Sequence, residues 1–504
     1  MTILIIPIAF ILISCLIYRH LTKKLNYWEQ RNIVGPQPMP FFGNLKESAL
    51  RRQPVGLVYK KFYHDYPQEK VVGIYLMKTP ALLIRDLEIT KHILIKDFDT
   101  FADRGIKFGE KDLGQNLFHA DGDTWRQLRS RFTPLFTSGK LKNMLYLIIE
   151  RADRFIEHLD KVTTIDPEQE VHFLMQKFTQ ATIAACAFGL DIDSYDTQAE
   201  TLQRIDKKIF TVNSSSILDM MYPGILKKMG KSKFPSEVKD FFVNLTKKVI
   251  AQRNGKPTDR NDFMDLMLAL REKQILGPKG DTDTGAEKVV EMSDSVITAQ
   301  SFVFYAAGYE TSASTMGFML YQLALNPDIQ DKVIAEIDEV MKKHDGVISL
   351  ESMSELNYMT KVFDETLRMY PIIDKLKRCA QMDYKVPGTD VTIMKGQTVL
   401  VSVHGIHFDE VYYPRPDIFD PERFSVKNVA DRHSCAYMPF GLGPRHCIGM
   451  RFAQVQSRVC MTKLLARYRV EASASTKSRC QFSPTRLVLY PEGGIRLNFV
   501  KRQP

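Results

Sequence analysis

The chain of 504 residues is poor in the features that mark zinc proteins and disulfide-stapled domains. It has seven cysteines with irregular spacing, at positions 15, 186, 379, 435, 447, 460 and 480. No CxxC pair occurs, so a zinc site with the usual ligand spacing is not expected. A chain of this length does not depend on disulfides for its core, and the pattern suits a reducing compartment.

The sequence also lacks internal repeats, low-complexity tracts and blocks of like charge. Its composition, 44% hydrophobic and 25% charged, is that of an ordinary globular protein. A net charge of +10 favours anionic neighbours, which could be nucleic acid, an acidic protein face or an anionic membrane surface. Because the charge is spread along the chain and not gathered in tails, nucleic acid is not expected as a partner.

The N-terminus carries an apolar run without a cleavage site. Residues 3–18, ILIIPIAFILISCLIY, are followed by basic residues and by no A-x-A-like sequence, which argues against a signal peptide. Sixteen residues is slightly short of the ~20 that span a bilayer, but is within reach of a thin endoplasmic reticulum membrane. We predict a membrane anchor over residues 1–20, with the body in the cytosol by the positive-inside rule. The alternative, a buried core helix, is disfavoured because the run has no polar face.

One linker-like stretch follows the anchor. Residues 21–44 are basic and proline-rich, with three prolines in GPQPMPFFGN (35–44), and predict an extended hinge. No second linker of this kind occurs, so 45–504 is predicted to be a single catalytic domain. The fold class is mainly α with a minor β region (α+β). Helical patterns are found at 123–136, 140–160, 171–188, 236–254, 293–326, 328–343, 355–370 and 449–468, and strand-like ones at 70–76, 81–84, 391–394, 397–402 and 486–490.

The helix predicted over 293–326 is long enough to cross the whole body, and its middle reads FYAAGYETSAS (304–314). Gly308 costs roughly 1 kcal/mol relative to alanine there. Thr311 can hydrogen-bond back to the carbonyl of Ala307 and bend the helix. Glu310 beside this opening could deliver protons from water. From these residues alone, a packing glycine and a satisfied threonine remain an equally good interpretation.

Two further stretches place charges at helical spacing. In ETLR, Glu365 and Arg368 form an i, i+3 pair of a kind that usually contributes only ~0.2–0.5 kcal/mol at a surface. With Arg423 of PERF they could instead form a buried Glu–Arg–Arg network. In WRQLRSRF, Trp125 and Arg129 share a helix face and offer donors suited to carboxylates, although such a motif is more often a basic surface helix.

The stretch PFGLGPRHCIGM (439–450) places one thiol behind a glycine-rich bend and before a helical pattern. Cys447 could be a structural cysteine, a nucleophile or a metal ligand. The positive end of the helix dipole favours a thiolate. The glycines do not make a dinucleotide fingerprint, because no GxGxxG spacing and no preceding strand are present. A nucleophile pair with His446 has poor geometry, since adjacent residues at a helix start point in different directions.

Together these stretches resemble the cytochrome P450 family over the length of the chain. The haem-binding motif FxxGxRxCxG, the oxygen-binding motif AGx(D/E)T, the ExxR motif and the PERF element all occur, in the right order and at the right separations. The residues that match them are Phe440, Gly443, Arg445, Cys447 and Gly449; Ala307, Gly308, Glu310 and Thr311; Glu365 and Arg368; and Arg423. NYWEQRNI and AAGYETSAS are similar to insect microsomal P450s of family six, whose members often oxidise plant toxins and insecticides.

The resemblance implies a haem b cofactor (iron protoporphyrin IX) with Cys447 as the axial iron ligand. It assigns Glu310 and Thr311 to proton delivery, with Thr311 holding dioxygen and a water molecule, and a structural role beneath the haem to Glu365, Arg368 and Arg423. Phe440 packs near the thiolate. The residues assigned to haem binding are Cys447, Arg445, Trp125, Arg129, Arg378, Arg104, Phe440, Gly441, Gly449 and Ala307.

The activity implied by the resemblance is monooxygenation of lipophilic compounds, with NADPH acting only through NADPH–cytochrome P450 reductase. We expect a microsomal location in contact with membrane lipid, cytochrome b5 as a further candidate partner, and reductase docking at Arg126, Arg131 and Arg451. Substrate contacts are expected at 104–122, Phe302, Tyr305, Ala306, 372–377 and 482–485. Two alternatives stay open: a dedicated step in hormone or lipid metabolism, and a haem-thiolate isomerase or binding protein without a reductase, which has little use for a Glu310–Thr311 relay.

Overall fold

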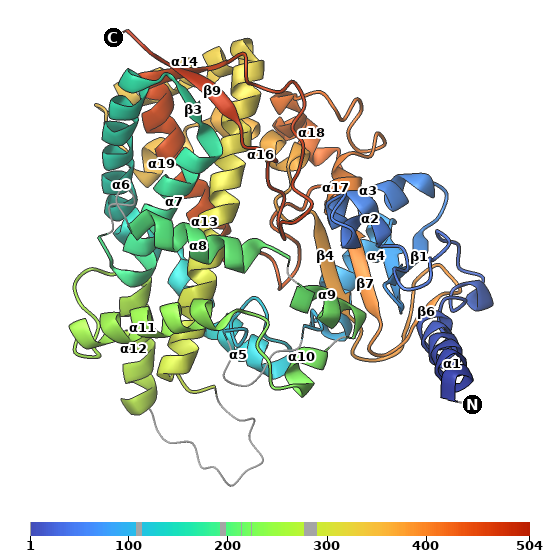
Figure 1. Cartoon of the computed structure of the whole chain (residues 1–504). Helices are drawn as coiled ribbons and strands as arrows, with labels where there is room; N and C mark the ends of the chain where they lie inside the picture. The colour runs from blue at the N-terminus through green and yellow to red at the C-terminus, as the bar shows by residue number, and fades with distance from the viewer. Residues whose placement is uncertain are drawn as a thin grey trace.

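A long helix, α13 (Asp294–Leu325), runs through the body and most other helices gather around it (Figure 1). The structure, a computed structural model, describes residues 2–106, 113–191, 198–212, 214–222, 224–276 and 290–503, without the side chains of 2–5, 198–203, 214, 216, 220 and 274–276. Residues 107–112 of the expected substrate loop and the stretch 277–289 therefore lie outside the described residues.

The described part of the chain is mainly helical with a minor β region, as predicted. The longer helices of the body are α3 (Val55–Asp65), α5 (Gly122–Phe132), α6 (Ser138–Ile165), α7 (Val171–Phe188), α8 (Gln198–Phe210), α11 (Ser236–Gln252), α12 (Phe263–Leu276), α14 (Pro327–Lys343), α16 (Asn357–Met369) and α19 (Met450–Arg467). Short helices are α2 (Lys46–Ala49), α4 (Leu87–Lys91), α9 (Ser214–Met221), α10 (Ile225–Lys228), α15 (Leu350–Ser354), α17 (Val403–His407) and α18 (Val426–Ala430).

Local sequence explains where α13 begins and ends. The Ser293 hydroxyl accepts a hydrogen bond from the Val296 amide at the N-terminus. Asn326 precedes Pro327 at the C-terminus, and the residue before proline disfavours the helical conformation. Pro327 in turn occupies the first position of α14, where its missing amide hydrogen costs nothing. Helix α13 packs along α7 and also contacts α11, α16 and α19, so nearly all of its side chains are buried.

The main sheet has the strand order β1-β2-β7-β4 and lies beside the helical part (Figure 1). Its strands are β1 (Val71–Leu76), β2 (Thr79–Ile84), β4 (Lys375–Cys379) and β7 (Thr398–Ser402). Only the β2–β7 pair is parallel. A second sheet joins β3 (Glu168–Glu170), β9 (Arg496–Lys501) and β8 (Tyr468–Ala472), and β5 (Tyr384–Lys385) pairs with β6 (Thr392–Ile393). A smaller hydrophobic cluster lies around the main sheet, and a larger one surrounds α13.

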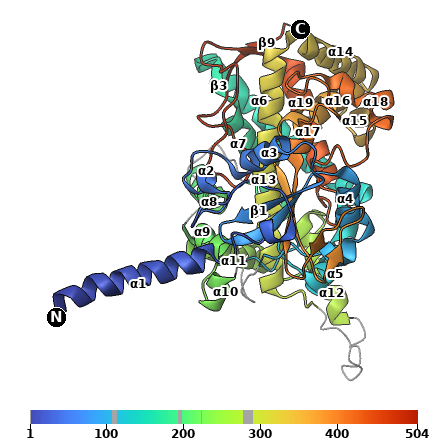
Figure 2. The same ribbon diagram turned by 90° about the vertical axis from the view of Figure 1, so that its right-hand side faces the viewer.

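The N-terminal helix α1 (Thr2–Thr22) projects away from the body (Figure 2). Among the described residues, the structure contains no helix with the length and apolar character needed to cross a membrane. The segment expected to be a hinge lies against β1. Trp28 is buried there, with its indole N–H donating to the Ile74 carbonyl over 3.0 Å.

Most of the expected elements agree with the structure to within a few residues, but the strand expected at 486–490 is wrong. No strand of the described chain includes these residues. Their amides bond instead to two separate parts of the chain, Leu487 to the carbonyl of Phe210 at the end of α8 and Leu489 to the carbonyl of Ile372 in a loop. The alternation of apolar residues here arises because the segment packs between separate parts of the chain, and it does not indicate a strand of a sheet.

Candidate functional site

The loop before α19 forms a tight bend around Cys447. The Cys447 amide donates to the Phe440 carbonyl over 2.8 Å, and the His446 amide donates to the Gly443 carbonyl over 2.9 Å. Gly441 and Gly443 adopt φ of +72° and +69°, a region that glycine enters without strain. The bend therefore depends on two glycines. Cys447 lies three residues before Met450, the first residue of α19.

Gly443 also permits a close backbone contact. A Cβ at this position would lie 1.8 Å from the carbonyl oxygen of Leu94, in the π-helical turn η2 (His92–Lys96). No side chain fits into that contact, so only glycine lets the loop settle against η2. At Gly441 the nearest atom to such a Cβ is 3.8 Å away, so the requirement there is for the backbone angle alone.

Cys447 lies deep in the protein, but its own side chain remains exposed. The side chain is not covered by neighbouring protein atoms, and neither is Ala307, although most of α13 around Ala307 is buried. Burial raises the pKa of the Cys447 thiol, while the Gly449 amide and the charges of Arg129 and Arg104 oppose the rise. The helix terminus does not offset this rise, and a metal cation bound to the sulfur would favour the thiolate.

Arg445 is buried, and it bridges three parts of the site. Its Nε donates to the Ala102 carbonyl and its Nη2 to the Ala120 carbonyl, both over 2.8 Å. The guanidinium lies 4.2 Å above the Trp125 ring and 3.3 Å from Asp121 Oδ1. Its Nη1 has no hydrogen-bond partner in the structure.

Two further cations, Arg378 and Arg104, face the same region. Arg378 on β4 is buried, and its Nε is also without a partner. Burial, together with the charge of Arg445, lowers the pKa of Arg378 to about 10. Burial and the charges of Arg378 and Arg445 lower the pKa of Arg104 well below its usual range. Crowded buried cations with unused donors favour an anionic ligand.

The residues present therefore fit a haem. Two orphaned buried guanidinium donors, Arg445 Nη1 and Arg378 Nε, match the carboxylate chemistry of propionates. The uncovered thiol of Cys447 supplies a soft iron ligand, and Ala307 offers a small uncovered surface on α13.

Other expected haem contacts lie in the same part of the structure. Trp125 on α5 packs against Phe98 and under Arg445. Arg129, one helical turn later, donates through Nη1 to the His446 carbonyl over 3.0 Å. This bond to a backbone carbonyl ties α5 to the Cys447 loop. Phe440 packs against the main core, and a Cβ on Gly449 would reach only Phe136, at 4.0 Å.

Thr311 makes the expected back-bond, with its hydroxyl donating to the Ala307 carbonyl over 2.6 Å. The adjacent Glu310 points to a different environment. Its side chain is fully buried and is held by His172 and Gln176 of α7, with Nε2 of each residue 3.1 and 2.8 Å from a carboxylate oxygen. Glu310 is therefore not freely exposed beside Thr311 but is fixed between α13 and α7.

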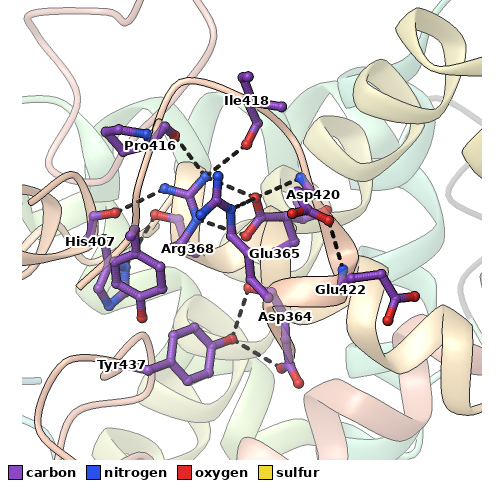
Figure 3. A network of polar contacts seen from close by, with 12 residues as sticks. Asp364, Glu365, Arg368, His407, Pro416, Ile418, Asp420, Glu422 and Tyr437 are labelled. Carbon is purple, nitrogen blue, oxygen red and sulfur yellow. Dashed lines mark hydrogen bonds and ion pairs between the residues drawn. The ribbon is translucent and has the colours of Figure 1, made fainter. Parts of the chain in front are cut away.

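On α16, Glu365 and Arg368 form a bidentate ion pair (Figure 3). Arg368 also donates to the carbonyls of His407 and Pro416, over 2.9 and 2.8 Å, and the Asp420 amide donates to Glu365 over 2.9 Å. Arg423 Nε lies 3.4 Å from Glu365 Oε1, close enough for an ion pair but without the alignment of a hydrogen bond. The three charged residues therefore form a buried network.

His407 is a member of this network that sequence reasoning missed. Its Nδ1 donates to the Arg368 carbonyl over 3.2 Å, and its Nε2 accepts from the Met438 amide over 3.1 Å. Burial and the charge of Arg368 lower the pKa of His407 to about 3, so the ring is neutral and its two nitrogens can take these opposite roles. His407 thereby links the ion pair to the loop that carries Cys447. In the sequence it is one of two closely spaced histidines, with His404, ahead of the PERF element, and nothing there marks it as a partner of Arg368.

Two of the expected substrate contacts lie on another face of α13. Phe302 packs on Phe234 and Phe242, and Tyr305 accepts a hydrogen bond from Gln180 over 3.0 Å. Both are buried and point away from Ala307, because residues two and five positions earlier lie on the opposite side of a helix. Ala306 is buried too. In the protein alone, Phe302 and Tyr305 are thus occupied by contacts with other side chains, and their contact with substrate stays a prediction.

The three arginines expected to bind a reductase have different surroundings. Arg126 is exposed and pairs with Asp99 at 2.7 Å. Arg451 is exposed and donates to the Ser138 hydroxyl over 3.3 Å. Arg131 is half-buried and bonds to the Val290 carbonyl, so its charge is already partly engaged.

Comparison with known proteins agrees with this geometry. The family model for Cytochrome P450 matches residues 34–499. The chain is 56% identical to Cytochrome P450 6B1 of Papilio polyxenes over 487 residues, which cover 97% of each chain. It is 52% identical to Cytochrome P450 6B2 of Helicoverpa armigera over 498 residues, 99% of this chain and 98% of the relative. Cytochrome P450 6a2 of Drosophila melanogaster is 37% identical over 503 residues, 97% of each chain.

Proposed function

Because this chain belongs to the cytochrome P450 family, we propose that it is a microsomal monooxygenase that oxidises lipophilic foreign compounds such as plant toxins and insecticides. Monooxygenase activity and a haem cofactor follow from the family. The observation that carries the site assignment is the set of unused guanidinium donors of Arg445 and Arg378 beside the uncovered thiol of Cys447.

The haem, when bound, supplies the oxygen-activating chemistry, and the protein supplies a ligand, an orientation and protons. Cys447 would ligate the iron as a thiolate, and the Arg445 and Arg378 guanidinium groups would bind the propionates. Arg445 is held in place by two carbonyls and by Trp125, so it would present Nη1 in a fixed direction. The Glu365–Arg368–His407 network would keep the Cys447 loop in register beneath the cofactor.

Proton supply would come from α13. The Thr311 hydroxyl bonds to the Ala307 carbonyl and uses one of that oxygen's lone pairs, which weakens the regular helix at this point. A water molecule at such an opening could be ordered by Thr311 and would receive its proton from Glu310. Replacing Thr311 by valine should lower the product formed per NADPH consumed and raise hydrogen peroxide release.

The site chemistry can be tested directly. The ferrous–CO complex should show the red-shifted Soret band of a thiolate ligand, and Cys447→Ala should abolish that band together with activity. If turnover survives in Cys447→Ala, the assignment of the iron ligand is wrong. NADPH-dependent consumption of O2 with reductase distinguishes a monooxygenase from a haem-thiolate isomerase or binding protein, which would consume none.

The substrate class rests on the resemblance to insect P450s of family six. The competing assignment is a dedicated step in hormone or lipid biosynthesis. A panel of plant-derived and synthetic lipophilic compounds, assayed with reconstituted enzyme, separates the two. Turnover of several unrelated compounds supports clearance of foreign chemicals, whereas activity on a single endogenous lipid or hormone precursor would reject it.

The membrane assignment is supported by the apolar residues of α1 and by the basic residues that follow it. Ile6, Phe10 and Leu16 are 72%, 72% and 65% exposed, which is costly in water and favourable in lipid. We place the anchor in the endoplasmic reticulum membrane, with the catalytic domain facing the cytosol. Sedimentation with microsomes that is lost on deletion of residues 1–20 tests this placement; a variant that still sediments would contradict it.

The basic side of the Cys447 loop would dock the reductase, whose contact face should then be acidic, and cytochrome b5 is a second candidate. Arg126→Glu removes the pair with Asp99 and reverses the exposed charge. It should slow reductase-supported turnover and leave peroxide-supported turnover unchanged. An equal loss in both assays would reject this docking role.

A further inference from the structure

Glu310 is the centre of a buried polar cluster between α13, α7 and the C-terminal segment. Oε1 accepts a hydrogen bond from the Ser314 hydroxyl over 2.9 Å and lies 3.1 Å from His172 Nε2. Oε2 accepts from the Gln176 amide over 2.8 Å and lies 3.5 Å from Arg486 Nη2. Because an ionised carboxylate can only accept hydrogen bonds, Nε2 of His172 is the protonated nitrogen and donates to Glu310.

Arg486 is shared between two carboxylates. The same Nη2 atom lies 2.9 Å from Asp206 Oδ2 on α8, and the guanidinium is 4.4 Å from the centre of the Tyr490 ring. The side chains of Arg486 and Asp206 are 8% and 6% exposed, so water screens these charges little. The cation is therefore placed where the pull of Asp206 competes with that of Glu310.

The backbone that carries Arg486 is attached to the end of α8. The Val212 amide donates to the Thr485 carbonyl, and the Leu487 amide donates to the Phe210 carbonyl, each over 2.8 Å. Asp206 lies one helical turn before Phe210. A displacement of the C-terminal end of α8 would thus carry Arg486 with it and change its distance from Glu310 on the long, fixed helix α13.

The charges in the cluster decide where a proton binds. Burial acts to raise the pKa of Glu310, but the His172 and Arg486 charges and the Gln176 hydrogen bond outweigh it, and the pKa is lowered. Burial and the nearby Glu310 charge raise the pKa of Asp206 to about 6. The remaining titratable groups that face Glu310 are Tyr305, Tyr309 and Tyr490; burial raises the pKa of each, so they stay neutral. Of the two carboxylates, Asp206 therefore takes a proton before Glu310 on acidification.

We propose that His172 and Arg486 are positioning residues that hold the Glu310 carboxylate ionised in one orientation, and that Asp206 makes this hold depend on the position of α8. With α8 in the position seen in the structure, Glu310 is deprotonated and oriented toward α7. When the end of α8 moves and takes Arg486 with it, Glu310 gains proton affinity, so it can accept a proton from hydronium in the solvent and pass it to the water at Thr311. The proposal deepens the proposed function, since it rests on Glu310 as the proton donor.

Infrared spectroscopy of the haem-loaded, full-length protein tests this positioning without turnover. The carboxyl band of Glu310 is identified as the one missing in Glu310→Gln and is followed from pH 4 to 9. Arg486→Met and His172→Phe should each raise the proton affinity of Glu310 at least tenfold, and Arg486→Lys should have a smaller effect. Asp206→Asn should lower it, because Arg486 then interacts with Glu310 alone.

Arg253→Met is a matched control. Arg253 is also a buried arginine between two carboxylates, Asp262 and Asp265, and none of these touches Glu310. This control should destabilise the protein and leave the Glu310 titration unchanged. If Arg486→Met behaves like Arg253→Met, or if Asp206→Asn and Arg486→Met shift the titration in the same direction, the proposal is wrong. If Arg486→Met does not fold, Arg486→Lys and Asp206→Asn still test the proposal. They should shift the proton affinity of Glu310 in opposite directions.

Coupling measurements keep this proposal distinct from the proton-donor role itself. Arg486→Met and His172→Phe should change the pH dependence of product formed per NADPH consumed, which a purely structural loss would scale down uniformly. If Glu310→Gln retains full coupling and an unchanged solvent isotope effect, Glu310 is not the proton donor. The infrared titration would then still report whether His172 and Arg486 hold its charge.

Discussion

Arg368 and Glu365 meet in a two-pronged ion pair, with Nε 2.7 Å from Oε2 and Nη2 2.9 Å from Oε1, and both side chains are fully buried. Arg368 also donates through Nη1 to the carbonyl of His407, at the end of α17, and through Nη2 to the carbonyl of Pro416 in a loop. A surface pair of the same spacing would contribute little. Here the pair organises backbone that no helix or sheet satisfies, and through His407 it reaches the amide that precedes Pro439 and the Cys447 loop.

Glu365→Gln should prevent accumulation of haem-containing protein. Removing one partner of a buried pair leaves an uncompensated charge on Arg368 and costs about 3–5 kcal/mol. The measurement is the ferrous–CO band per unit of protein, together with the urea midpoint of unfolding. Glu422→Gln is the control. Glu422 pairs at 2.9 Å with Lys361, which lies on α16 like Glu365, but Glu422 is exposed, so this substitution should cost less than about 1 kcal/mol of stability. Similar losses in both variants would contradict a special role for the buried pair.

Gly443→Ala should be far more damaging than Gly441→Ala. Both residues have positive φ, so both substitutions strain the backbone by about 1 kcal/mol. Only at Gly443 does the new methyl group also collide with the Leu94 carbonyl, at 1.8 Å. Haem content and the thermal midpoint should fall in the order wild type, Gly441→Ala, Gly443→Ala. Equal effects would show that the backbone angle alone matters and that the contact with η2 can relax.

Arg445→Lys should weaken haem retention although the charge is kept. Lysine cannot donate to both Ala102 and Ala120 and still present a free donor, and it loses the planar contact with Trp125. We expect at least a tenfold faster transfer of haem to apomyoglobin, followed by absorbance. Arg496→Lys, at an exposed ion pair with Glu168, is the control and should not change the transfer rate. Unchanged transfer in Arg445→Lys would remove Arg445 from the propionate site.

The stability of the protein should depend on pH through Asp364. Burial raises the pKa of this carboxyl to about 6 from an ordinary value of 3.8. The folded state therefore binds the proton more tightly than the unfolded state, and stability falls as pH rises from about 4 to 6 and stays low above it. Asp364→Asn should match wild type at pH 4 and be more stable by about 2 kcal/mol at pH 7.5, as measured by urea unfolding.

Tyr437→Phe provides the opposite test of the same carboxyl. The Tyr437 hydroxyl donates to Asp364 Oδ1 over 3.0 Å, and this bond lowers the pKa of Asp364 against the effect of burial. Without it the pKa should rise further, so the loss of stability should extend to higher pH. A pH profile that is the same in Asp364→Asn, Tyr437→Phe and wild type would assign the pH dependence to other groups.

The sequence alone determined the elements whose signal is local. The length of α13 follows from a run of apolar residues bounded by Ser293 and Pro327. The Cys447 loop follows from glycines and a thiol at short fixed spacing, and the Thr311 back-bond from a hydroxyl four residues after Ala307. Each of these depends on neighbours in the chain, so each can be read without knowing the fold.

Tertiary structure decided which distant groups meet. His407 joins Arg368 to Met438 across 39 and 31 residues, and Arg486 reaches Glu310 from more than 170 residues away. Helical spacing put Tyr305 on α13 but could not say which face of the helix would be covered by α7 and α11. Burial, and with it the ionisation of Glu310, Asp206 and Asp364, depends on the elements packed against each residue. Only the folded chain fixes those neighbours, because the free energy of a buried charge is set by its whole surroundings and not by its place in the sequence.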